Sequence, residues 1–107
     1  MIYEWRKSAK AQLKKSVTYC VQQFGKHVAL RFIDSIDHQV NLLASHPHLG
    51  SIEPRLENRK RTYRSLVVHE HFKLVYYIDV QKDLLYIVAL WDTRREPAAL
   101  TSQIRSK

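Results

Sequence analysis

Arginine side chains stand out among the residues of this 107-residue chain that could take part in chemistry. Arg64 opens an alternating apolar segment, with Leu66 and Val68 at the same parity, and Arg94 follows the apolar run of residues 84–91. A guanidinium group keeps its charge and grips phosphate oxygens with a planar fork of N–H donors. The sequence therefore offers groups suited to holding a phosphate.

A second group of cations lies in the turn-rich segment of residues 46–61. Only Glu57 interrupts its basic residues, which are Arg55, Arg59, Lys60 and Arg61. A basic loop tracks phosphate groups well but carries no sequence information. We predict that this loop contacts a polyanion, and the same patch is equally suited to an acidic protein.

General acid–base chemistry has two candidates. His69, at the end of a predicted strand, could give or take a proton near Arg64. Asp92 could act as a base only if burial raised its pKa, and adjacent arginines have the opposite effect. We therefore expect a structural ion pair between Asp92 and one of the arginines, namely Arg64, Arg94 or Arg95.

Other chemistry-bearing residues have plainer interpretations. Two His-x-His pairs, at residues 46–48 and 69–71, fall at turns without a third ligand, so we expect no metal site and no cofactor. Cys20 is on an apolar helical stripe and reads as a core residue. Three tyrosines could stack on bases, although such residues in strands are more often buried: Tyr76, Tyr77 and Tyr86.

The composition sets the broad class. Lys and Arg number 18 against 10 Asp and Glu, which gives a net charge of +8 and favours an anionic partner. The hydrophobic share of 45% excludes a disordered chain, and the longest apolar run, eight residues, is too short for a membrane span. The length predicts a single domain (1–107). The charged N-terminus and the single cysteine, which excludes an intrachain disulfide, indicate the cytoplasm.

The elements that must position these groups follow from hydrophobic spacing. Steps of three and four predict helices over residues 9–24, capped by Ser8, and 26–44, separated by Gly25. Short β runs are predicted at 2–5, 62–69, 72–80 and 84–91, and a final helical turn at 97–100. The predicted fold is α+β, ordered β-α-α-β-β-β. A helical hairpin packs on one face of a small antiparallel sheet, and the other face is open to solvent, ligand or partner.

At this level of detail the chain resembles the RelE/ParE superfamily of bacterial toxins. The matching pieces, in order, are the opening strand with Trp5, Phe24-Gly25, Leu42 to Gly50, Arg64-Ser65-Leu66, Leu74-Val75-Tyr76-Tyr77 and Asp92 to Pro97. The resemblance implies the toxin half of a type II toxin–antitoxin module, silenced by a small cognate antitoxin. The RelE-like branch cleaves messenger RNA on the ribosome, whereas the ParE-like branch poisons DNA gyrase without known nuclease chemistry.

The RelE-like branch also implies roles for single residues. Arg64 matches the strand arginine that contacts the scissile phosphate, Arg94 matches a second such arginine, and the 55–61 loop with Arg95 matches the RNA grip. Asp92 stands where several relatives have a histidine, and no Tyr or His follows Trp91. We rank a metal-independent mRNA endonuclease slightly ahead of a gyrase inhibitor, with an inactive nucleic-acid-binding relative as a third hypothesis.

Overall fold

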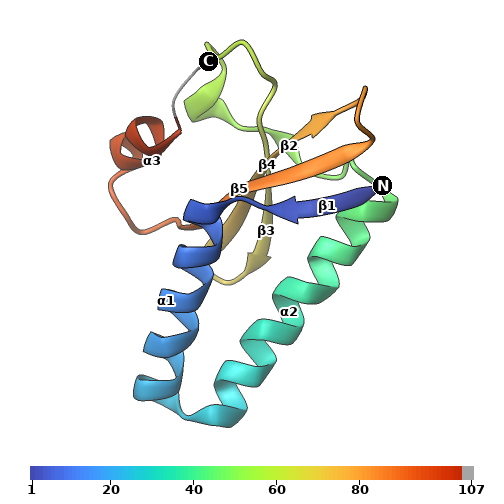
Figure 1. The fold of residues 1–107 in the computed structure, drawn as a ribbon. Helices are drawn as coiled ribbons and strands as arrows, with labels where there is room; N and C mark the ends of the chain where they lie inside the picture. Colours follow the sequence, from blue (N-terminus) through green and yellow to red (C-terminus); the bar gives the residue numbers. More distant parts are fainter. Residues whose placement is uncertain (105–107) are drawn as a thin grey trace.

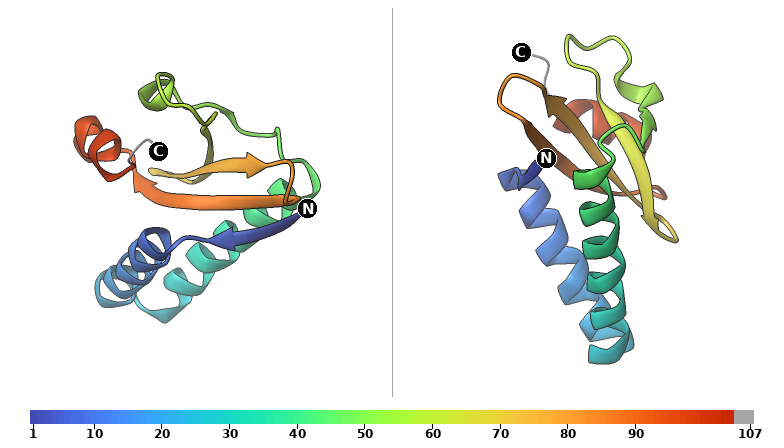
Figure 2. Two further views of the ribbon diagram at one scale, coloured as in Figure 1. Left: turned by 45° about the horizontal axis from the view of Figure 1, so that its top comes forward. Right: turned by 90° about the vertical axis from the view of Figure 1, so that its right-hand side faces the viewer.

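The computed structural model describes residues 1–104 and places a helical hairpin, a sheet and a short covering layer one upon another (Figure 1, Figure 2). The predicted α+β class and the packing of the hairpin on the sheet are confirmed. In chain order the elements are β1 (Ile2–Trp5), α1 (Lys7–Phe24), α2 (Lys26–Ser45), β2 (Ser51–Ile52), the 3-10 helix η1 (Pro54–Leu56), β3 (Arg64–His69), β4 (Phe72–Asp79), β5 (Leu84–Asp92) and α3 (Pro97–Gln103).

The sheet is mixed rather than purely antiparallel, in the order β1-β5-β4-β3-β2. Strands β3, β4 and β5 form the predicted antiparallel meander, but β1 pairs parallel with β5. A parallel pair needs a long crossover, and the α1–α2 hairpin lies in that connection. β5 is internal, as its apolar run indicated. The two-residue β2 was not predicted because so short a segment has no alternation to recognise.

A single residue separates the two helices of the hairpin. Gly25 has a positive φ of 88°, which confirms the predicted glycine stop, and its N–H donates to the carbonyl of Val21. The predicted cap at Ser8 is wrong, because α1 begins at Lys7 after Arg6. The Arg6 N–H continues the pairing of β1 by donating to the Ile87 carbonyl, and the Ser8 hydroxyl donates to the Val88 carbonyl instead.

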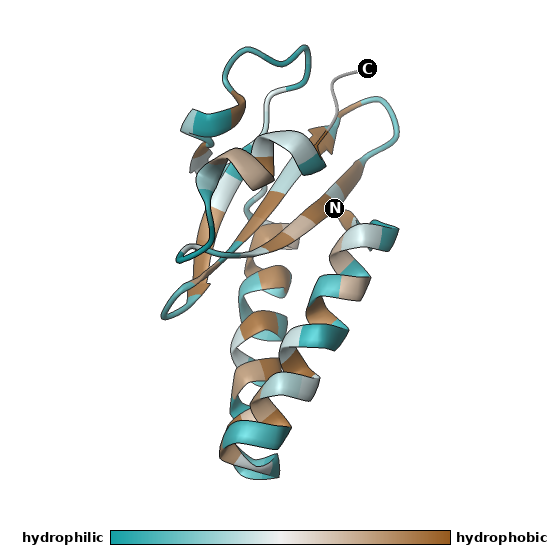
Figure 3. Cartoon of the chain, turned by 90° about the vertical axis from the view of Figure 1, so that its left-hand side faces the viewer, coloured by the Kyte–Doolittle hydropathy of each residue, from teal (hydrophilic) through white to brown (hydrophobic). Residues whose placement is uncertain are grey.

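Apolar side chains between the hairpin and the sheet form the first core. Figure 3 shows apolar colour along the strands and more polar colour on the loops around them. The helical spacing that predicted α2 places its buried residues on one stripe facing the sheet. The buried members of this core are Ala9, Phe32, Ile36, Val40, Leu43, Val68, Leu74, Tyr76, Leu85, Ile87 and Leu90.

The second face of the sheet is also covered, so the prediction of an open face is wrong. η1 and α3 lie over it and enclose a second core, whose buried members are Leu56, Tyr63, Val75, Tyr77, Tyr86, Ala89, Trp91, Leu100 and Ile104. Long-range contacts hold the cover in place. Arg59 donates to the Thr101 carbonyl at 2.7 Å, and the Gln12 amide donates to Gln103 at 2.9 Å. These tertiary contacts leave no periodic signal in the sequence.

No helix in the described part of the chain is both long enough and apolar enough to span a membrane.

Candidate functional site

Arg64 lies at the beginning of β3 and is engaged in a structural contact. It shares the hairpin-facing side of the strand with Leu66 and Val68, and its Nη1 donates to the carbonyl of Gly50 at 2.8 Å. Gly50 is also held by Tyr76, whose hydroxyl accepts the Gly50 N–H at 2.9 Å and donates to the Pro47 carbonyl at 2.7 Å. Arg64 therefore helps to fasten the segment that connects α2 to β2.

The other predicted catalytic residues gather at the opposite end of the sheet. Register pairs His69 with Phe72 and Phe72 with Asp92, while Arg64 pairs with Tyr76. The length of β3 separates the two ends by about 16 Å at 3.3 Å per residue. His69, Asp92 and Arg94 are thus neighbours, and Arg64 is not among them. The phosphate-holding pair of Arg64 and Arg94 that we expected is not assembled.

Asp92 forms the expected ion pair, and its partner is Arg94. The Arg94 guanidinium donates to both carboxylate oxygens at 3.0 and 2.9 Å, and the Arg94 backbone N–H donates to the same carboxylate at 2.9 Å. These hydrogen bonds lower the pKa of Asp92, chiefly through the side chain of Arg94. A carboxylate held ionised in this way is a weak proton acceptor, so the arrangement does not support Asp92 as a general base.

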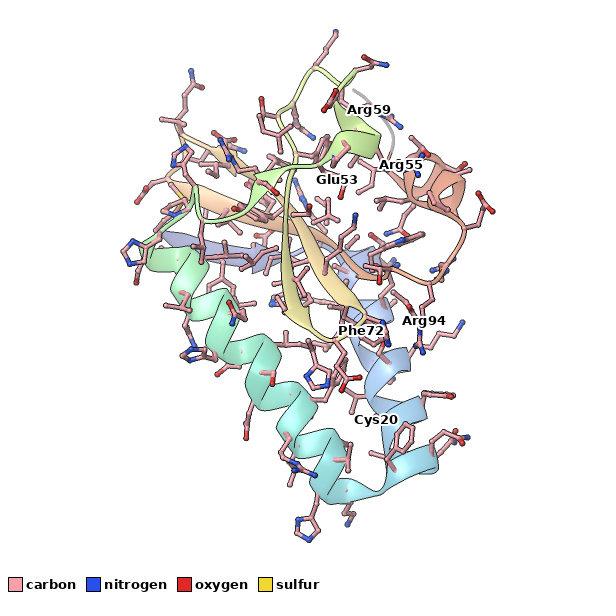
Figure 4. All side chains as sticks on the ribbon, turned by 180° about the vertical axis from the view of Figure 1, so that it is seen from behind. Cys20, Glu53, Arg55, Arg59, Phe72 and Arg94 are labelled. Carbon is pink, nitrogen blue, oxygen red and sulfur yellow. The ribbon has the colours of Figure 1, made fainter. Side chains whose placement is uncertain are left out.

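A groove of about 910 Å³ opens between the helical hairpin and this end of the sheet. Figure 4 shows Cys20, Phe72 and Arg94 around it. His69 lines the groove, and its ring is edge-on to that of Phe32, at 5.3 Å between centroids. Its lining combines apolar side chains of the hairpin, such as Phe24, Val28 and Phe32, with the charged side chains Lys15, Glu70, Asp92, Arg94 and Arg95.

The basic loop is anchored by a buried ion pair that we had not predicted. Glu53 is fully buried and accepts from Lys73 and from the Arg55 N–H, the latter at 2.9 Å. Burial alone would raise the pKa of Glu53, but these hydrogen bonds outweigh it and the pKa is lowered. Figure 4 shows Glu53, Arg55 and Arg59 close together. The sequence signal that could have indicated this ion pair was the presence of the acidic residue Glu53 in a basic segment.

The cations of the loop have unequal surroundings. The Arg55 and Lys60 side chains are exposed, whereas Arg59 is bound to α3 as described above. The Arg61 guanidinium carbon lies 4.4 Å from the centre of the Tyr77 ring, and that of Arg95, which lies outside this loop and follows β5, is likewise 4.4 Å from the centre of the Trp91 ring. The loop therefore combines free charges with charges that cover the second core.

Arg6 is a further cation of this kind, and sequence reasoning missed it. Its guanidinium carbon lies 4.2 Å from the centre of the Tyr86 ring, and its Nη2 donates to the Tyr77 hydroxyl at 3.1 Å. That hydrogen bond raises the pKa of Arg6. The position of Arg6 in the sequence, between a strand and a helix, did not indicate its contacts with Tyr77 and Tyr86.

Stacking of bases on the three tyrosines is not possible in this structure. Tyr76 is fully buried in the first core, and Tyr77 and Tyr86 are 5% and 6% exposed in the second. Their rings are already covered by side chains. Within the described residues no group of three or more His, Cys, Asp or Glu side chains could hold a metal ion.

Comparison with family models identifies one family. A family model described as ParE toxin of type II toxin–antitoxin system, parDE, matches residues 3–97. Among solved structures, a chain of the chromosomal ParDE TA system from P. aeruginosa is similar, with a TM-score of 0.67 and 21% identity over 84% of this chain and 92% of that chain. At that identity the likeness shows the fold. A search of curated proteins finds no match.

Proposed function

This chain belongs to the ParE toxin family of type II toxin–antitoxin systems, and from that premise we propose that it inhibits DNA gyrase by direct contact rather than by cleaving RNA. Membership implies a cognate antitoxin as the resting partner. The target is the part of the function that needs a test, because the sequence left gyrase and the ribosome as alternatives.

One observation carries the choice of gyrase. The residues that RNA cleavage would need are divided between the two ends of β3, with Arg64 bound to Gly50 and Asp92 paired with Arg94. Metal-independent cleavage requires phosphate stabilisation and proton transfer at one place. Inhibition by contact needs no such assembly, so the observed arrangement is compatible with it.

The end of the helical hairpin offers a surface for that contact. Around the Gly25 turn, several large apolar side chains are exposed, notably Tyr19 at 57%, Phe24 at 63% and Leu30 at 55%. Large exposed apolar side chains that lie near one another are typical of protein-binding sites. We propose that this end of the hairpin contributes to gyrase binding.

The groove between the hairpin and the sheet is the proposed antitoxin site. The apolar side chains that the hairpin contributes to its lining suit a helix-in-groove mode of binding, and the cations Lys15 and Arg95 in that lining would attract an acidic segment. An amphipathic, acidic segment of the antitoxin matches both features. The acidic side chains Glu70 and Asp92 also belong to the lining, and Asp92 is already paired.

The experiment measures supercoiling by purified gyrase in the presence of the purified chain. We expect inhibition with accumulation of cleaved DNA, and no new RNA 5′ ends in a parallel translation reaction. The double substitution Tyr19→Ser and Phe24→Ser should weaken the inhibition, because it removes the apolar contact surface. Val80→Ser, at a site 81% exposed on the distant β4–β5 turn, is the matched control and should inhibit like the parent chain.

Two results would contradict the proposal. Undiminished supercoiling at saturating toxin would remove gyrase as the target. New RNA ends that depend on ribosomes, and that disappear in Arg94→Ala but persist in Arg31→Ala, would instead support the endonuclease, because Arg94 was the exposed candidate for phosphate contact in that hypothesis.

A further inference from the structure

Two arginines from distant parts of the chain converge on one tyrosine. Arg6 comes from the junction of β1 and α1, and Arg61 from the loop before β3. Arg6 donates to the Tyr77 hydroxyl and Arg61 lies over the Tyr77 ring. Arg6 also lies over Tyr86, whose ring is 5.1 Å from that of Tyr77 at an interplanar angle of 31°. The two positive charges are therefore held close together on the α3 side of the sheet.

The positive charges of this pair are poorly balanced by carboxylates. Among residues 1–104, Arg6 has one acidic neighbour, Glu4, at 3.7 Å, and the two side chains are 47% and 52% exposed, so water screens that interaction. Arg61 is exposed and makes no ion pair within residues 1–104. Arg94, by comparison, is matched by Asp92. Two neighbouring cations without a matching anion favour an external one.

The position of the arginines against the rings also decides what kind of anion fits. A guanidinium group whose carbon lies over a ring retains N–H donors for a second partner, and phosphate oxygens match its planar fork. The rings beneath are 5–6% exposed and already covered, so bases cannot stack on them. Binding through phosphates alone favours the nucleic acid with the higher charge density, which is a duplex.

We propose that Arg6 and Arg61, held over Tyr77 and Tyr86, bind the phosphate backbone of duplex DNA. In relation to the proposed function, this DNA would be the segment that gyrase holds, so the toxin would contact both components of the enzyme–DNA complex. The binding itself requires no gyrase, and it is therefore measured separately from supercoiling.

The test is fluorescence anisotropy of labelled 20-base-pair DNA with the purified chain at several salt concentrations. For Arg6→Gln with Arg61→Gln we expect the slope of log K against log salt to become less negative by about 1.8, because two phosphate contacts are lost. Arg61→Gln alone should change it by about 0.9. The matched control, Lys26→Gln with Arg31→Gln, removes two exposed charges from α2 and should leave the slope unchanged.

A measurement on the unmodified chain guards against a variant that fails to fold. Side-chain Nε–Hε signals of Arg6 and Arg61 should shift on addition of the duplex, while that of Arg31 should not. Glu4→Gln should tighten binding, because it removes the single acidic neighbour of Arg6.

Several outcomes would overturn the inference. These are an absence of duplex binding, equal loss of slope in the α2 control, or tighter binding of single-stranded DNA or RNA than of the duplex. DNA binding that depends on Arg6 and Arg61 without any inhibition of gyrase would support the inference and contradict the proposed function instead, so the two failures are distinguishable.

Discussion

Between the helical hairpin and the sheet two of the eleven buried core residues are aromatic, whereas between the sheet and α3 four of nine are. The first core is covered by two helices of 18 and 20 residues, and the second by a helix of seven residues. Arginine side chains complete the second cover, with Arg6, Arg61 and Arg95 lying on its rings.

The difference shows that the two faces of one sheet are covered in different ways. Long helices can bury aliphatic residues without help from charge. A short helix leaves ring edges uncovered, and a guanidinium group can cover a ring while keeping its charge in water. On the face with the shorter helical cover, three arginines therefore lie over aromatic rings, and their charge remains available to a partner.

The most damaging single change should be Lys73→Met on the α3 side. It leaves the Glu53 carboxylate buried without its charged partner, and such a loss costs about 3–5 kcal/mol. Urea denaturation of the purified chain measures it. The double variant Glu53→Leu with Lys73→Met should recover most of the lost stability, and a double variant as unstable as the single one would show that the charge is not the cause.

Cavity-forming changes compare the two cores directly. Leu43→Ala, under α2, should cost about 3–4 kcal/mol, because long helices cannot collapse into the space. Leu100→Ala, on the seven-residue α3, should cost about 2 kcal/mol, because a short helix can shift to fill it. Both residues are almost fully buried, at 0% and 1% exposed. Equal losses in denaturation midpoints would remove this distinction between the faces.

Acidification should affect the α3 side through Glu53. The folded-state pKa of Glu53 lies below its ordinary value of 4.5, so its contribution to stability is complete above the unfolded-state pKa and is lost as pH falls through the folded-state pKa. The loss should be smaller than for Leu100→Ala. Denaturation midpoints between pH 7 and pH 3 should fall less steeply in Glu53→Gln than in the parent chain, and parallel curves would contradict the assignment.

The smallest expected effect concerns the arginine cover itself. Arg61→Gln removes the contact with the Tyr77 ring and should cost about 0.5–1 kcal/mol. Lys60→Gln, an exposed neighbour, is the matched control and should change stability negligibly. If both variants lose the same amount, loop charge rather than ring contact is responsible.

Local sequence patterns predicted the fold well where they were regular. The helical stripes, Gly25 and the apolar β5 run each gave a signal within a few residues, and the resemblance placed the chain in the correct superfamily. The covering layer escaped prediction because α3 is held by residues far away in the sequence, such as Gln12 and Arg59.

The candidate site was harder to predict than the fold. An ion pair of Asp92 with Arg64, Arg94 or Arg95 was expected, and the structure confirms the pair with Arg94 as the partner. The grouping of Arg64 with Arg94 and His69 was wrong, because strand register places Arg64 at the opposite end of β3. Parity alone says which side a strand residue occupies but not what the facing segment does, and here that segment supplies the Gly50 carbonyl.

The Gly25 link has a mechanical consequence. Its N–H completes the last turn of α1 and its carbonyl accepts from Ala29 in the first turn of α2, so both helices are joined without slack. A protein bound at the neighbouring Phe24 would therefore exert force on both helices together. That force would be transmitted along the hairpin to the sheet at β1, to which α1 is attached through Arg6.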